Sequence, residues 1–507
     1  MKKKIEKKEV ITFFSILGTI IIICCNFLQM HFSSDTFVLY KLGYFNYPSE
    51  YFLQDGRLIS TLFCYLGGIL HLPIPVYIIA MDFIGMIFLA IAIHIISKIF
   101  INIIKPDSLK KEILIYLASF VLILNQYTLE YLLFPESAVM CMGVLFIVLA
   151  IKALVSDSKN KYLKIFFYLL ITGLSYQGEL NIFPVLVLLV LIVKQIKEKK
   201  ETKEFLKTTL KEIVKIMAIT ISVLAICTII VNICAEIFNS KKESMILIRN
   251  ETMLRRKLNL VKFYSRDIVI NCISMLPKFS ILICPIVTLI LLIITNAKVH
   301  TIVNYIIYYI VSLASVVLPL FIITAAVCAR LSVPAMMIFG ASLIILIANI
   351  EVELKDWKKK MINIIVILIF VLNAGFIVRN TTEHIAANKI DADEGRQIKY
   401  MIDKYEEETG NKVTKFAYKY DMNPQQYATG IKHMESLTER KLACVWCIEY
   451  AMQYFCERDL EWAHFSSYIF REDNNDRMYR NIENKDYNCF SQDQIIIKDD
   501  TIYMIVY

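Results

Sequence analysis

The feature that most constrains this chain is a succession of long apolar segments separated by short polar stretches. Each approaches the ~20 apolar residues that an α-helix needs to cross ~30 Å of hydrocarbon, and the segments lack the alternating pattern of a transmembrane β-strand. With 57% hydrophobic residues, the chain has more apolar surface than one soluble core could bury. The sequence therefore predicts an α-helical polytopic membrane protein.

We expect about eleven transmembrane helices. Their predicted ranges are 10–30, 73–97, 112–132, 137–155, 164–176, 180–194, 213–234, 279–296, 301–324, 334–350 and 361–378. Segments 58–71 and 164–176 are short for a crossing, so a count one or two away from eleven also fits the pattern.

Lysine-rich loops predict the sidedness of these helices. The basic start MKKKIEKKE resists translocation, which places the N-terminus in the cytoplasm. Alternate loops are then cytoplasmic, and each carries lysines, as in KDWKKK. Loop 235–278 is also basic but falls outside, which signals either an error in this topology or a surface that binds anions. The abundance of Lys, Ile and Asn suggests a bacterial source, and hence its plasma membrane.

The chain divides into a transmembrane part, 1–378, and a polar C-terminal part, 379–507, in which acidic residues outnumber basic ones. The second part predicts a small, water-soluble α/β domain outside the cytoplasm. It combines the helical pattern of DADEGRQIKYMIDKYEEETG with the strand-like VTKFAYKY, and QIIIKDD and TIYMIVY predict a terminal hairpin. Cys444, Cys447, Cys456 and Cys489 in this part fit a metal site, a disulfide pair or, more simply, scattered buried thiols.

Polar side chains gather at the predicted outer ends of the spans, where charge is expensive and marks substrate paths or catalytic sites. Several loops contribute them, which favours a single extracytoplasmic site. They are His31, Ser33, Ser34, Asp35, Tyr44, Asp55, Arg57, Asn125, Gln126, Glu130, Glu136, Tyr176, Gln177, Glu179 and Arg330.

Each of these residues also has a simpler structural explanation. Asp35 and Asp55 could cap the helices that follow them, with Gly56 as a turn. Glu136 follows Pro135 and could be an acid in the first turn of a helix. Arg57 and Arg330 could reach headgroups, and Tyr176 could belong to the interfacial aromatic belt. The functional interpretation therefore rests on the set and not on one residue.

The set fits the transfer of a sugar from a polyprenyl-phosphate carrier. The acceptor hydroxyl is a weak nucleophile and needs a base, for which Asp35 is the candidate. Arg57 and Arg330 could stabilise the departing lipid phosphate. Polar groups could grip the sugar hydroxyls in an otherwise apolar pocket. The candidates for this substrate-binding role are Asp55, Glu130, Glu136, Tyr176, Gln177 and Glu179.

The stretches SSDTF, YFLQDGRLIS, LFPESAVM and GLSYQGE resemble the membrane glucosyltransferases of the O-antigen-modifying type, a family with the GT-C fold. The resemblance covers roughly residues 1–350 and is best over 1–180. It implies a polyprenyl-phosphate sugar donor, Asp35 as the catalytic acid position, and a cavity lined by Tyr176 and Gln177. It also implies that Gly56 and Arg57 open a juxtamembrane helix at about 58–70, within outer loop 31–72. Members of this family usually carry an acidic pair where this chain has Asp35 alone.

The predicted function is therefore a membrane glycosyltransferase, with glucose as the family's default sugar. Its partners are a polyprenyl-phosphate-linked donor, an envelope glycan acceptor and membrane lipid, with no nucleic acid. A polysaccharide polymerase or ligase is the alternative, with the basic stretch IRNETMLRRKLNLVKFYSR as its arginine loop. A flippase fits less well, because no internal repeat is seen and the polarity lies at one face. No cofactor is implied, and the sequence leaves open whether a divalent metal takes part.

Overall fold

The computed structural model describes residues 7–198, 202–237, 251–317, 328–350, 354–420, 434–444, 446–463 and 492–506. The chain divides into two compact units, each described by itself. Unit 1 contains residues 1–29 and 44–379, and unit 2 contains residues 30–43 and 380–507. The short segment 30–43 thus belongs with the C-terminal part of the chain.

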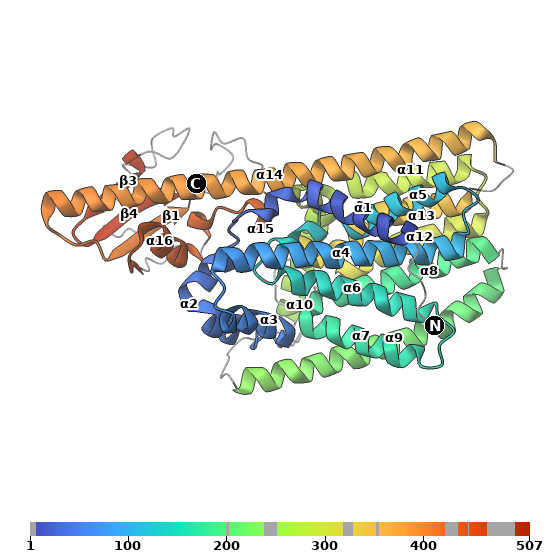
Figure 1. The fold of residues 1–507 in the computed structure, drawn as a ribbon, viewed down its shortest axis with the longest axis horizontal. Coiled ribbons are helices and arrows are strands. Elements are labelled where there is room, and N and C mark those ends of the chain that lie inside the picture. Colours follow the sequence, from blue (N-terminus) through green and yellow to red (C-terminus); the bar gives the residue numbers. More distant parts are fainter. Residues whose placement is uncertain are drawn as a thin grey trace. The chain divides into compact units, whose positions relative to one another are not determined.

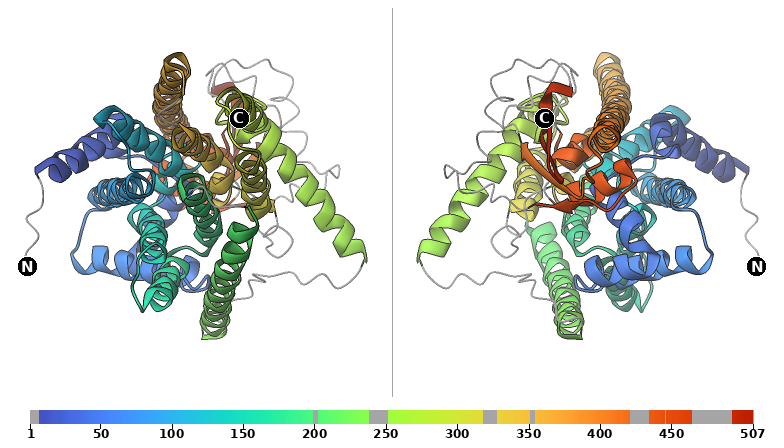
Figure 2. Two further views of the ribbon diagram at one scale, coloured as in Figure 1. Left: turned by 90° about the vertical axis from the view of Figure 1, so that its right-hand side faces the viewer. Right: turned by 90° about the vertical axis from the view of Figure 1, so that its left-hand side faces the viewer.

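Unit 1 is built from helices (Figures 1 and 2). Its α-helices are α1 (Lys7–Ile23), α3 (Leu58–Ile69), α4 (Ile74–Ile104), α5 (Leu109–Ile123), α6 (Ser137–Leu154), α7 (Lys161–Ser175), α8 (Ile182–Glu198), α9 (Thr202–Ile237), α10 (Glu251–Arg266), α11 (Ser280–Ile294), α12 (Val299–Val317) and α13 (Val333–Asn349). Helices α2 (Ser34–Tyr51) and α14 (Asp356–Thr409) each contain a unit boundary. In α2 the boundary follows Gly43, whose φ of 71° interrupts the helix.

The predicted α-helical polytopic membrane protein is confirmed. Among the described residues, six helices are long and apolar enough to cross a membrane: α4, α6, the stretch Gln177–Glu198 that includes α8, α9, α12 and α14. Three shorter apolar helices are α3, α11 and α13. The number of spans, about eleven, stays a prediction, and so does the side of the membrane on which each end lies.

Two predicted spans end earlier than expected. The helix predicted over 112–132 stops at Ile123, because the side-chain oxygen of Asn125 accepts backbone hydrogen bonds from Tyr127 (3.0 Å) and Thr128 (3.1 Å) and starts a turn. A 3₁₀ helix, Thr128–Leu132, follows. The span predicted over 10–30 likewise ends at Ile23 and continues as a 3₁₀ turn, Cys25–Leu28.

The helices of unit 1 place the charged groups of the sequence at two opposite ends. Helix α4 packs against α6, α6 against α7, and α5 against α13. At the lysine-rich ends, Lys8 pairs with Glu112 (2.8 Å) and Lys98 with Glu9 (3.4 Å). The segments 55–57, 125–136, 176–181 and 328–332 lie at the other ends of the same helices. The chain therefore collects its candidate site residues from four segments at one end of the bundle.

Unit 2 combines a four-stranded sheet with helices. The strands, in the order β2-β1-β4-β3, are β1 (Lys415–Tyr420), β2 (Glu461–Trp462), β3 (Ile495–Lys498) and β4 (Thr501–Val506). β1 pairs in parallel with β2 and β4, whereas β3 and β4 form the predicted antiparallel hairpin. The helices are the end of α14, α15 (Glu435–Thr438) and α16 (Ile448–Cys456).

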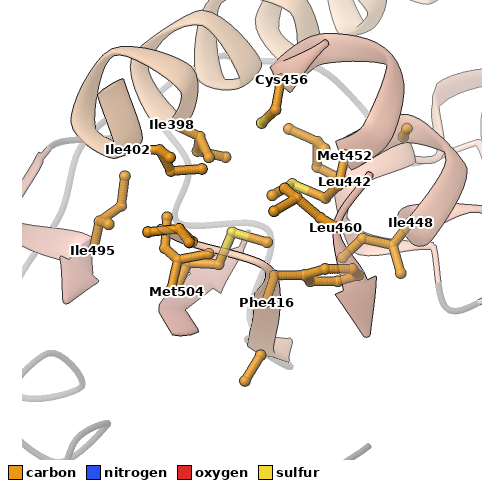
Figure 3. Packing of buried hydrophobic residues seen from close by; sticks show 14 of the residues in the cluster. Ile398, Ile402, Phe416, Leu442, Ile448, Met452, Cys456, Leu460, Ile495 and Met504 are labelled. Atoms are coloured by element: carbon orange, nitrogen blue, oxygen red, sulfur yellow. The ribbon is translucent and has the colours of Figure 1, made fainter. Parts of the chain in front are cut away.

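The core of unit 2 lies between α14, α16 and the sheet. Figure 3 shows Ile398 and Ile402 of α14 beside Met504, with Phe416 across from Met452. These side chains are fully buried, so their removal from water stabilises the unit. A soluble α/β domain over 379–507 outside the cytoplasm stays a prediction, and the unit also includes residues 30–43.

The cysteines of unit 2 that the structure describes fit the simplest of the three predictions. Cys444, Cys447 and Cys456 are free and buried. In the described parts of the chain, no group of three or more His, Cys, Asp or Glu side chains is placed to hold a metal ion. Cys489 lies outside the described residues. Burial raises the pKa of the Cys456 thiol to about 12, as expected of a thiol that serves as a small hydrophobe.

The contact between α13 and α5 allows a test of this packing. A Cβ atom on Gly340 would lie 2.4 Å from the backbone Cα of Leu122. Gly340→Ala should therefore lower the free energy of unfolding by about 1–3 kcal/mol, because the two backbones must separate. Gly18→Ala is the control, since nothing lies within 4 Å of that Cβ position. Thermal unfolding of the detergent-solubilised variants measures the difference, and equal midpoints would contradict the packing of α13 on α5.

Candidate functional site

The turn before α3 positions Arg57. The N–H of Gly56 donates to the carbonyl of Leu53 (3.0 Å), and the N–H of Arg57 donates to that of Phe52 (2.9 Å). Gly56 has a φ of 70°, and a Cβ there would lie 2.7 Å from Val231 of α9. Glycine is therefore needed both for the backbone conformation and for the close approach of α9. Arg57 occupies the N-cap position of α3, two residues after Asp55.

Arg57 contacts two carboxylates and an aromatic ring. Its guanidinium lies 3.5 Å from Glu136 and 3.5 Å from Asp55. It also lies over the ring of Tyr176, 5.0 Å from the centroid. Burial alone would lower the pKa of Arg57, but Asp55, Tyr176 and Glu136 outweigh burial and raise that pKa. The guanidinium is therefore held as a cation at the start of α3.

Arg330 is held in a similar way, in the turn before α13. Its Nε donates to the hydroxyl of Tyr176 (3.1 Å), and its guanidinium lies 3.4 Å from Glu130. Its backbone N–H donates to the same carboxylate (2.5 Å), and its carbonyl accepts from the hydroxyl of Tyr131 (2.8 Å). The guanidinium also lies 4.5 Å from the ring centroid of Phe134. Backbone and side chain of Arg330 are thus both fixed.

Tyr176 links the two arginines, one through its ring and the other through its hydroxyl. The next residue, Gln177, donates from its side-chain amide to the carbonyl of Asp55 (3.1 Å) and so ties this segment to the Arg57 turn. Side-chain contacts therefore join seven of the nine predicted site residues. We call these seven the arginine cluster: Asp55, Arg57, Glu130, Glu136, Tyr176, Gln177 and Arg330.

The exposed fractions of these side chains differ between the glutamates and the arginines. Glu130 and Glu136 are 0% and 3% exposed, whereas Arg57 and Arg330 are each 22% exposed. Buried carboxylates thus contact each guanidinium, while part of each arginine side chain stays accessible. The third carboxylate of the cluster, that of Asp55 beside Arg57, is 31% exposed.

Glu179 lies close in sequence to the arginine cluster and is fully buried. Neither of its carboxylate oxygens has a hydrogen-bond partner among the described residues. A Cβ on Gly143 of α6 would lie 1.8 Å from its Oε2, so glycine makes room for this carboxylate. The structure thus places the Glu179 carboxylate beside α6, and Glu179 meets the cluster through its backbone N–H, which donates to the carbonyl of Tyr176 (3.2 Å).

Asp35 lies in unit 2, whereas the arginine cluster belongs to unit 1. Asp35 is in the first turn of α2. The cap of that helix comes from its neighbours: Ser33 N–H donates to Thr36 Oγ1 (3.1 Å), and Thr36 N–H donates to Ser33 Oγ (3.3 Å). Asp35 itself is the second residue of α2, and its role as a base stays a prediction.

Two residues that contact Arg330 were not among the predicted site residues. Tyr131 and Phe134 both contact Arg330, yet they read as ordinary members of the apolar run between Glu130 and Glu136. The available signal was their position, because an aromatic residue between two acids at a helix end is well placed for an arginine. The explanation of Glu136 as a first-turn acid also changes, since Glu136 is the N-cap residue of α6 and its carboxylate pairs with Arg57.

These features define a polytopic helical membrane protein with a fixed pair of arginines at one end of its bundle. The chain belongs to the glucosyl transferase GtrII family, whose family model matches residues 44–346. It is therefore a glycosyltransferase, as the resemblance implied. The matched region contains the whole arginine cluster and Glu179, but neither Asp35 nor residues 380–507. A comparison with curated proteins finds no match to the chain.

The hydroxyl of Tyr176 can be tested by removing it alone. Tyr176→Phe keeps the ring beneath Arg57 but removes the hydrogen bond to Arg330. A hydrogen bond to a charged group contributes about 1.5 kcal/mol, so kcat/KM for sugar transfer should fall about tenfold. Tyr168→Phe in α7 is the control, because no hydrogen bond of that hydroxyl is seen within the described residues. Equal kcat/KM values for the two variants would contradict this role of Tyr176.

Proposed function

We propose that this protein transfers a hexose, with glucose as the family's default, from a polyprenyl-phosphate carrier to an envelope glycan on the outer face of the bacterial plasma membrane. The observation that carries the proposal is the pair of partly exposed arginine side chains whose guanidinium groups pair with buried Glu130 and Glu136. When the glycosidic bond breaks, the lipid phosphate gains negative charge, and fixed cations stabilise that charge most in a site poor in water.

The helix that starts at Arg57 supports a lipid-linked donor. Leu62, Leu66 and Ile69 of α3 are spaced as one helical face and are 65%, 49% and 64% exposed. A phosphate at Arg57 could therefore extend its hydrocarbon chain along α3 without burying polar groups. A free nucleotide sugar would gain nothing from such a surface, which favours the polyprenyl carrier.

In this proposal different side chains act on the donor and on the acceptor. Arg57 and Arg330 bind the donor phosphate, while Asp55 and Gln177, the polar groups near them that are not fully buried, bind sugar hydroxyls. Asp35 takes the proton of the acceptor hydroxyl as that oxygen attacks the anomeric carbon and the phosphate leaves. The proposal routes no step through a metal ion.

The role of Asp35 is tested by Asp35→Asn, which keeps the size of the side chain but removes its basicity. Sugar transfer should fall at least about 100-fold, in line with the contribution of a general base, at normal membrane levels of the protein. Asp157→Asn, in the exposed loop before α7, is the control. Transfer is read by comparing purified envelope glycans from cells with wild type, variant or no protein. Retained transfer would rule out Asp35 as the base, and identical glycans with and without the protein would rule out the proposed acceptor.

The donor-phosphate role is tested by Arg57→Lys, which keeps the charge but loses the planar fork that binds phosphate bidentately. The KM for the polyprenyl-phosphate sugar should rise about tenfold or more. Arg266→Lys, in the basic helix α10, is the matched comparison, because the polymerase or ligase alternative assigns the anion to that stretch. A larger effect at Arg266 than at Arg57 would favour the alternative.

A further inference from the structure

Unit 2 joins two stretches that are far apart in the sequence, residues 30–43 and 380–507. Both lie outside the region matched by the family model. The first stretch is short and carries Asp35, while the second supplies a sheet, α16 and the end of α14. The contacts within this unit show what the second stretch does for the first.

Asn388 of α14 forms two hydrogen bonds with the backbone of one residue. Its Oδ1 accepts from the N–H of Phe32 (2.7 Å), and its Nδ2 donates to the carbonyl of Phe32 (3.0 Å). This pairing resembles that of a neighbouring β-strand and needs a side chain that both donates and accepts. It fixes the orientation of the backbone three residues before Asp35.

One turn earlier on the same helix, His384 holds the preceding residue. Its Nδ1 lies 2.6 Å from the carbonyl of Leu437, so Nδ1 carries the proton and donates. Its Nε2 then accepts from the Nδ1 of His31, 3.1 Å away. Both rings are buried, so His31 is fixed with its ring in one tautomer.

Aromatic packing fixes the residues on both sides of Asp35. Phe32 and Phe37 stack on each other with centroids 4.9 Å apart, and Phe37 lies 5.4 Å from Phe455 of α16. Phe37 belongs to the hydrophobic core of unit 2, and the reciprocal bonds of Ser33 and Thr36 close the turn between the rings. Asp35 is therefore carried by a backbone segment that is anchored before and after it.

We propose that residues 380–507 act as the positioning element for the catalytic base Asp35, with Asn388 as the principal positioning residue. The inference rests on the proposed function, in which Asp35 is the base. A general base must lie within hydrogen-bond reach of the proton it takes, and a misplacement of about 1 Å can cost about 100-fold in rate. A short segment with little core of its own meets that demand only when another part of the chain holds it.

The test begins with Asn388→Ala, which removes both hydrogen bonds to Phe32. The kcat for sugar transfer should fall at least about tenfold, while the KM for the polyprenyl-phosphate donor stays unchanged, because the arginine cluster lies in unit 1. Gln453→Ala is the matched control: it removes an amide-to-backbone bond in the same unit, to Leu460, and leaves segment 30–43 untouched. Thermal unfolding gives the amount of folded protein by which kcat is normalised.

Hydrogen exchange at residue resolution ties the kinetic effect to the segment. The N–H of Phe32 should exchange faster in Asn388→Ala, while that of Val413, which donates to Glu406 in the same unit, keeps its rate. Faster exchange at Phe32 with an unchanged kcat would overturn the inference, and so would a raised KM with an unchanged kcat.

Asn388→Asp separates positioning from general destabilisation. A protonated carboxyl can both accept from and donate to Phe32, whereas a carboxylate can only accept and repels the carbonyl. The ratio of variant to wild-type kcat should therefore be highest at low pH and fall as pH rises, and a ratio independent of pH would contradict the inference. Asp35→Asn distinguishes failure of the proposed function from failure of the positioning role. If it is inactive and Asn388→Ala has normal kcat, only the positioning role fails, whereas full activity of Asp35→Asn overturns both.

Discussion

The pairing of two buried glutamates with two arginines is the constraint on which unit 1 depends. Glu130 and Glu136 lie almost fully buried at the end of an apolar bundle, where an uncompensated carboxylate is very unfavourable. The chain meets this constraint with guanidinium groups from residues 57 and 330, which lie 79 and 200 positions away from their partners. Four segments must therefore converge at one end of the bundle, and Tyr176 can then contact both arginines. The same arrangement that makes the buried acids tolerable leaves two cations partly accessible.

Much of the fold could be predicted from the sequence, because apolar length and the positions of lysines are local signals. The departures occur where polar side chains find distant partners. The last predicted span ends at residue 378, yet α14 continues beyond it to Thr409. Helix can continue there because Asn388 and His384 bond to Phe32, His31 and Leu437, none of which is near in sequence. Hydropathy alone could not have predicted these partners.

The sequence indicated which residues belong to the candidate site, but not which of them pair with each other. Polarity at the ends of the spans singled out seven residues that the structure joins through side-chain contacts. It could not assign Glu130 to Arg330 or Glu136 to Arg57, because either acid has the right chemistry for either base. The choice depends on which helix ends meet, and that follows from the packing of α6, α7 and α13. Tyr176 was expected to line a cavity or lie in the aromatic belt, whereas its contacts place it between the two arginines.

The rigidity of unit 2 depends on a second buried charge group, on the same helix that carries Asn388. Arg440 bonds to Asp391 (2.8 Å) and Glu394 (2.5 Å), and the backbone N–H of Lys441 donates to Asp391 (3.0 Å). Both acids are buried, so loss of Arg440 would leave two uncompensated charges and loosen this part of α14. Because Asp391 follows Asn388 by less than one turn, the triad also fixes the helix at the point where Phe32 is bound. The hydrogen bonds to Phe32 can then hold the segment of Asp35 only as firmly as this ion triad holds α14.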